Sequence, residues 1–74
     1  PGTFDLVLAN LFAAQLVAFA ATFAERLVPG GTVIGAGVLD GEADAVRTAW
    51  RTAGLVAVDE WRADGWTALA WQRP

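Results

Sequence analysis

The chain has 74 residues, of which 55% are hydrophobic, and its formal net charge is −3. It contains neither Cys nor His, which excludes a disulfide framework, a thiolate metal site and nucleophilic catalysis by Ser-His or Cys-His pairs. Its five basic residues are all Arg and are scattered along the chain, so there is no basic stripe for a phosphate backbone and we expect no nucleic-acid binding.

An uncharged run of 19 residues between Asp5 and Glu25 is long enough to span a bilayer. However, Asn10, Gln15 and Thr22 interrupt it, and no Lys or Arg flanks its start. The run also divides into a strand and an amphipathic helix. There is no basic region of the kind that opens a secretory signal. We therefore expect no membrane association and assign the chain to the cytoplasm.

The first half of the chain predicts a strand, a helix and a second strand. Residues 4–9 are apolar on both faces, which is typical of a parallel strand that is buried on both sides. Apolar residues at spacings of three and four predict a helix over residues 11–28. Pro-Gly-Gly at 29–31 is expected to end it, because Pro cannot continue a helix and Gly adopts the left-handed cap conformation. Residues 32–36 predict the second strand.

The second half predicts another helix and a hairpin. Acidic residues crowd the start of this helix, where negative charge meets the positive end of the helix dipole. The start carries Asp40, Glu42 and Asp44, the buried stripe is Val46, Trp50 and Ala53, and the cap is Gly54. Strands are expected over residues 55–62 and 66–72. The short Ala-Asp-Gly link at 63–65 predicts that they form an antiparallel hairpin.

The predicted order is strand, helix, strand, helix, strand, strand, which defines an α/β fold. Crossovers between parallel strands are right-handed in nearly all proteins. If the sheet grows steadily in one direction, both helices lie on the same face and the opposite apolar face is bare. The first strand then also presents an open apolar edge, which natural domains avoid. We therefore expect an upstream segment to cover that face and pair with that edge.

Ligands of open α/β sheets bind at the carboxyl ends of the parallel strands, which here are residues 10–12 and 36–38. Asn10 carries the only uncharged hydrogen-bonding side chain at either end. Its amide oxygen can accept a hydrogen bond from an amine N–H and so aim the nitrogen lone pair at an electrophilic methyl group. Asn at a strand-to-helix junction is also a favoured N-cap, and the two roles are compatible.

Three other patterns have simpler interpretations. Gly-Ala-Gly at 35–37 suggests a dinucleotide loop, but Asp40 stands where the third Gly belongs and would repel a pyrophosphate. The acidic residues at 40–44 suggest a calcium loop, but its required Gly and final Glu are Ala45 and Arg51, so we expect no metal site. The Trp residues fall on helix or strand positions and are interpreted as packing residues. They are Trp50, Trp61, Trp66 and Trp71.

Five stretches, in this order and spacing, resemble the C-terminal part of PrmA-type ribosomal protein methyltransferases nearly from end to end. They are Phe4-Asp5-Leu6-Val7-Leu8-Ala9-Asn10-Leu11, Leu27-Val28-Pro29-Gly30-Gly31, Gly37-Val38-Leu39, Ala53-Gly54-Leu55 and Trp66-Thr67-Ala68-Leu69-Ala70. The Pro-Gly-Gly and the final hairpin are shared by most class I methyltransferases. The Ala-Asn-Leu after Asp-Leu-Val, with Gly-Val-Leu downstream, points more narrowly to this family.

The resemblance implies that residues 1–74 form the C-terminal half of a Rossmann-like class I methyltransferase sheet, without the N-terminal cofactor-binding half. It implies transfer of methyl groups from S-adenosylmethionine to amino groups of a ribosomal protein. Asn10 matches the family's Asn beside the methyl-transfer site and is the catalytic candidate. Asn10 and Leu11 are the expected cofactor contacts. Leu11, Phe12 and Gly37 are the expected substrate contacts.

The chain departs from the family pattern at several positions. Ala36 stands where the family commonly has Ser, Glu42 replaces a frequent Gln, and Trp50 replaces a frequent Tyr. The family's glycine-rich cofactor loop, ribose-binding acid and substrate-recognition domain have no counterpart in these residues. We therefore expect that the chain alone is inactive and does not bind S-adenosylmethionine.

Other functions remain open from the sequence. The motifs of the sheet do not name a substrate, so a class I methyltransferase with another acceptor is one alternative. A dinucleotide-binding fragment is a second. A third is a non-catalytic remnant whose apolar sheet face binds another chain.

Overall fold

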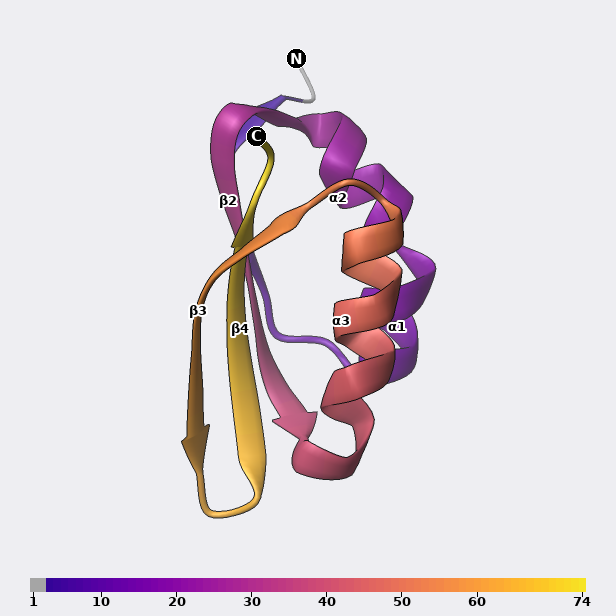
Figure 1. The fold of residues 1–74 in the computed structure, drawn as a ribbon, viewed down its shortest axis with the longest axis vertical. Coiled ribbons are helices and arrows are strands. Elements are labelled where there is room, and N and C mark those ends of the chain that lie inside the picture. The colour runs from indigo at the N-terminus through magenta and orange to yellow at the C-terminus, as the bar shows by residue number, and fades with distance from the viewer. Residues whose placement is uncertain (1–2) are drawn as a thin grey trace.

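A computed structural model describes residues 3–74, which form a four-stranded sheet with three α-helices on one face (Figure 1). The first half contains β1 (Phe4–Ala9), α1 (Ala13–Ala18), α2 (Ala20–Arg26) and β2 (Leu27–Leu39). A 3-10 turn (Asp40–Glu42) and α3 (Ala43–Thr52) follow, and β3 (Val56–Ala63) and β4 (Trp66–Gln72) end the fold. The predicted α/β class and order of elements are confirmed.

The strand order is β1-β2-β4-β3, with β1 and β2 parallel and both contacts of β4 antiparallel. The predicted hairpin is confirmed: Asp64 and Gly65 both have positive φ, 54° and 85°, as a two-residue type I′ turn requires. The strands do not follow one another across the sheet in chain order, because β4 lies between β2 and β3. The connection through α3 leads from β2 to β3, which is not the adjacent strand. The position between β2 and β3 is filled by β4, the second strand of the hairpin.

The helix predicted over residues 11–28 is shorter and consists of two pieces that meet at Phe19. It ends at Arg26, before the Pro-Gly-Gly that was expected to cap it, and Leu27 already has extended dihedral angles, φ −77° and ψ 136°. The residue before a Pro disfavours the helical conformation, so Val28 belongs to a strand. As a result β2 begins at Leu27 and runs through the Pro-Gly-Gly, well beyond the predicted 32–36.

The second predicted helix is confirmed as α3, together with its cap. Val46 and Trp50 are fully buried. Gly54 has a φ of 94° and its N–H donates to the Arg51 carbonyl, while the Leu55 N–H donates to the Trp50 carbonyl. This pair of bonds is the Schellman motif, which a Gly makes possible at the end of a helix.

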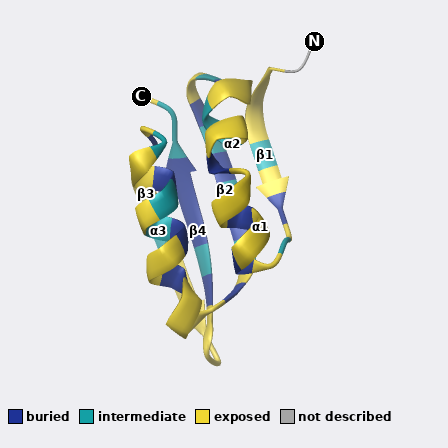
Figure 2. Ribbon diagram, turned by 90° about the vertical axis from the view of Figure 1, so that its right-hand side faces the viewer, coloured by how far each residue is buried: buried dark blue, intermediate teal, exposed yellow. Residues whose placement is uncertain are grey.

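The core lies between the helices and the sheet, and its centre is the indole of Trp50. The Trp50 Nε1–H donates to the Leu16 carbonyl at 3.1 Å, which joins α3 to α1. Trp50 also meets Phe23 and Trp71 edge to face, with centroid distances of 6.2 and 6.0 Å. Figure 2 shows the buried positions of β2 and β4 beneath the helices. Gly35 lies under the indole, where a Cβ would come within 3.0 Å of it.

The face of the sheet away from the helices is bare, as expected from the right-handed crossovers (Figure 1). Strand register assigns six large apolar side chains to this face, each at least 45% exposed. They are Leu6, Leu8, Leu39, Val56, Trp61 and Trp66. Within residues 3–74, β1 pairs with β2 alone, so its outer edge is open. None of the helices in residues 3–74 has the length and apolar character needed to cross a membrane.

Gly35→Ala should lower the free energy of unfolding by about 1–3 kcal/mol, because the added methyl group overpacks the contact between β2 and Trp50. Urea unfolding followed by Trp fluorescence measures this change. Gly41→Ala is the matched control, since nothing lies within 4 Å of its Cβ position, and it should be neutral or stabilising by up to about 1 kcal/mol. Equal effects of the two substitutions would contradict this account of the core.

Candidate functional site

A hollow of about 380 Å³ lies where β1 and β2 end, beside the first turn of α1. All four site residues predicted from the sequence line this hollow. They are Asn10, Leu11, Phe12 and Gly37. Two further residues complete the lining, Gln15 from α1 and Trp66 from β4. The carboxyl ends of the parallel strands therefore bring together residues that lie up to 56 positions apart, from Asn10 to Trp66.

The position of Asn10 depends on the absence of a side chain at residue 37. Asn10 directly follows β1 and is exposed. A Cβ on Gly37 would lie 3.1 Å from the Asn10 Oδ1. Gly37 also has a φ of 78°, in an irregularity of the β2–β4 ladder between Gly35 and Val38. A side chain at 37 would be strained by its backbone and would crowd the Asn10 amide.

The alternative role of Asn10 as a helix N-cap is wrong. Phe12 occupies the N-cap position of α1, and its N–H donates to the Gln15 Oε1 at 3.1 Å. Gln15 thus supplies the half of a capping box that reaches back from the third helical position. Among residues 3–74 the Asn10 amide has no hydrogen-bond partner. The amide is therefore available to a ligand in the hollow.

The structure divides the four Trp residues into two pairs. Trp50 and Trp71 are core residues, which confirms their interpretation as packing. Trp61 and Trp66 are half exposed on the bare face, and Trp66 also lines the hollow. Sequence reasoning did not place Trp66 at the site, because its position depends on β4 lying directly beside β2. The Asp40 N–H donates to the Gly65 carbonyl at 2.9 Å and holds the hairpin at this end of β2.

The dinucleotide interpretation of Gly-Ala-Gly at 35–37 does not agree with the structure. These residues lie inside β2, and α3 begins only at Ala43, so they form no turn between a strand and a helix N-terminus. Close packing under Trp50 explains Gly35. Two of the acidic residues at 40–44 also have partners within the protein: Asp40 accepts a hydrogen bond from the buried Thr67 hydroxyl, and Asp44 pairs with Arg47.

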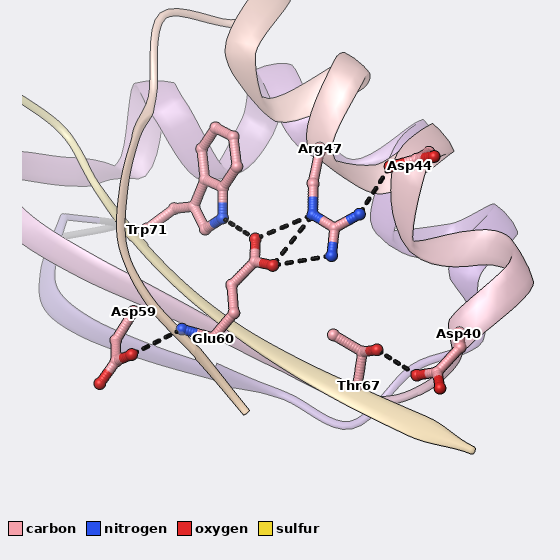
Figure 3. A network of polar contacts seen from close by, with 7 residues as sticks. All are labelled: Asp40, Asp44, Arg47, Asp59, Glu60, Thr67 and Trp71. Atoms are coloured by element: carbon pink, nitrogen blue, oxygen red, sulfur yellow. Dashed lines mark hydrogen bonds and ion pairs between the residues drawn. The ribbon is translucent and has the colours of Figure 1, made fainter. Parts of the chain in front are cut away.

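A polar network joins α3 to the hairpin that carries Trp66 (Figure 3). Arg47 donates to both carboxylate oxygens of Glu60, from Nε at 2.9 and 3.1 Å and from Nη2 at 2.8 Å, and the Trp71 Nε1–H donates to the same carboxylate at 3.3 Å. The hydrogen bond from Arg47 lowers the pKa of Glu60, with a smaller contribution from Trp71 and against the effect of burial. The carboxylate in turn raises the pKa of Arg47.

The parallel β1–β2 pair, the inserted antiparallel β4 and the hollow at the strand ends define a class I methyltransferase sheet. Solved structures agree. The ribosomal protein L11 methylase from Lactobacillus delbrueckii subsp. bulgaricus has a TM-score of 0.93 at 27% identity, over 99% of this chain and 38% of that one. The N-methyltransferase NodS from Bradyrhizobium japonicum has a TM-score of 0.69 at 16% identity, over 100% and 53% of the two chains, and it supports the fold alone.

The family of the ribosomal protein L11 methyltransferase (PrmA) matches residues 1–74, and the chain belongs to this family. The ribosomal protein L11 methyltransferase of Bradyrhizobium diazoefficiens is 46% identical over 68 residues, and that of Brucella suis is 41% identical over 66 residues. These alignments cover 92% and 89% of this chain. The chain spans 23% of the length of each relative. The family resemblance seen in the sequence is thereby confirmed.

The Glu60–Arg47 pair should make stability depend on pH. Because the folded pKa of Glu60 is lowered, its contribution is present above its ordinary pKa of 4.5 and is lost as the pH falls through the folded pKa. Urea unfolding between pH 7 and pH 3 should show a smaller loss of stability for Glu60→Gln than for the unchanged chain. Glu25→Gln, on the exposed surface of α2, should follow the unchanged chain. Parallel pH profiles for all three proteins would refute this role of Glu60.

Proposed function

We propose that this chain forms the acceptor side of a methyl-transfer site, in a protein that transfers methyl groups from S-adenosylmethionine to amino groups of ribosomal protein L11. The observation that carries the proposal is the Asn10 amide, which is exposed and has no hydrogen-bond partner among residues 3–74, in the hollow where β1 and β2 end. Ribosomal protein L11 is the proposed acceptor because of the family to which the chain belongs and the names of its relatives. The cytoplasm is the proposed compartment, because the acceptor is a ribosomal protein.

The chemistry of the hollow fits a neutral amine. S-adenosylmethionine supplies an electrophilic methyl group when it is bound, and the remaining task is to orient the nitrogen that receives it. The Asn10 Oδ1 accepts one N–H of the amine and so directs the lone pair away from itself. The rings of Phe12 and Trp66 give the hollow apolar walls for the aliphatic part of a side chain. Neither His nor Lys is needed as a base, and the chain has neither.

We further propose that an upstream half of the domain holds most of the cofactor and covers the bare sheet face. Three features support this: the apolar residues of that face, the open edge of β1, and the 23% of the relatives' length that the chain spans. On this proposal Asn10 and Leu11 contribute the cofactor contacts from this side.

The 74-residue chain by itself should not bind S-adenosylmethionine measurably, because most of the proposed cofactor contacts come from elsewhere. Titration calorimetry tests this, and saturable micromolar binding would overturn it. Sedimentation velocity distinguishes the proposed half-domain from the alternative of a non-catalytic remnant. A remnant that acts through its bare face should form a defined dimer, whereas a half-domain should form no oligomer of defined size.

Asn10→Ala should lower kcat for methylation of L11 by about 100-fold, since the amine loses its orienting acceptor. The test uses a chimera in which this chain replaces the matching segment of the Bradyrhizobium diazoefficiens relative, to which it is 46% identical. The affinity for S-adenosylmethionine should change much less than kcat. Thr48→Ala on the exposed surface of α3 is the control and should be neutral. An Asn10→Ala chimera that keeps a third or more of its kcat would exclude the proposed role.

A further inference from the structure

We propose that Gln15 is a positioning residue, which fixes the loop of residues 10–12 and thereby holds Asn10 for methyl transfer. This inference rests on the function proposed for Asn10. Gln15 is one of the residues that line the hollow, and its Oε1 accepts the Phe12 N–H at 3.1 Å. Nothing in the sequence pattern assigned it a role beyond a polar position in an apolar run.

The loop that carries Asn10 is short, and Leu11 in its middle packs against the core. At its start, Ala9 is buried and pairs with Gly35 in the β1–β2 ladder. At its end, the Phe12 side chain is 80% exposed, so packing contributes little to holding it. The Phe12 peptide group is held by hydrogen bonds instead. Its carbonyl accepts the N–H groups of Gln15 and Leu16 at 2.9 and 3.1 Å, and its N–H donates to the Gln15 side chain.

Gln15 directly precedes a residue of the buried core. The next residue, Leu16, is fully buried, and its carbonyl accepts the Trp50 Nε1–H. The α1 helix has only six residues, and Phe12 offers no side-chain acceptor at the N-cap. A helix this short is not stable through its own hydrogen bonds, so its first turn depends on such side-chain contacts. The Gln15 contact therefore carries the fixed geometry of the core to the loop beside the hollow.

Removing this contact should displace Asn10 without unfolding the protein. We expect Gln15→Ala to lower kcat about tenfold, since small displacements of a positioning group reduce rate more than binding. The KM for S-adenosylmethionine should stay within about twofold. Gln15→Glu should restore kcat, because its carboxylate accepts the same N–H. The comparison is made at a pH high enough to keep the acceptor amine neutral, since a carboxylate favours the ammonium form.

The experiment measures kcat, KM and the thermal midpoint of the same chimera with Gln15→Ala, Gln15→Glu and the matched control Gln72→Ala. Gln72, in β4, is not among the residues that line the hollow. Hydrogen exchange at the Phe12 amide gives a readout independent of activity. Support consists of a tenfold loss in kcat with Gln15→Ala, rescue by Gln15→Glu, faster exchange at Phe12 and no effect of Gln72→Ala.

Two outcomes would overturn the inference while leaving the proposed function in place. One is a Gln15→Ala chimera that keeps kcat within twofold while Asn10→Ala loses it. The other is a loss that Gln15→Glu does not rescue, or that follows a lower thermal midpoint, since the role of Gln15 is then only structural. A chimera without any methylation counts against the proposed function. In that case, unchanged exchange at Phe12 in Gln15→Ala overturns the Gln15 contact, and faster exchange supports it.

Discussion

The fold depends on the contact between the indole of Trp50 and the backbone of Gly35. Because residue 35 has no side chain, the indole approaches β2 closely enough for its Nε1–H to reach the Leu16 carbonyl at 3.1 Å. One side chain of α3 thus sets the height of α1 above the sheet. That height fixes where the chain must leave β1 to enter α1. The three residues of this connection, 10–12, all line the hollow.

The same one-sided packing explains why so much apolar surface is exposed on the other side. The helices α1, α2 and α3 all cover one face, as the right-handed crossovers of nearly all proteins lead us to expect. The strands nevertheless have apolar residues on both faces, which is the pattern of a sheet buried on both sides. Leu8 is 73% exposed at the open edge. The ion pair of Arg47 and Glu60 does not cover this apolar surface, because it lies on the helix side of the sheet.

Local signals in the sequence predicted β1, α3 and the hairpin, because each depends on a few adjacent residues: a doubly apolar run, a capped amphipathic stripe and an Asp-Gly turn. They failed where a second local signal outweighed the first, or where the strand order decided the outcome. Val28 is forced into a strand by Pro29, which shortened the predicted helix. Asn10 was a plausible cap until the helix proved to start at Ala13 with Gln15 reaching back. The place of Trp66 required the strand order, which a non-local pairing sets.

The four predicted site residues were found together because the carboxyl ends of parallel strands meet at one edge, whatever the details of the helices. The proposed function also restricts which side chain can stand at residue 10. Under the proposed function, Asp in that position would accept the same N–H but would favour an ammonium, which has no lone pair to receive a methyl group. A neutral amide oxygen accepts a hydrogen bond without that charge, and the chain has Asn there.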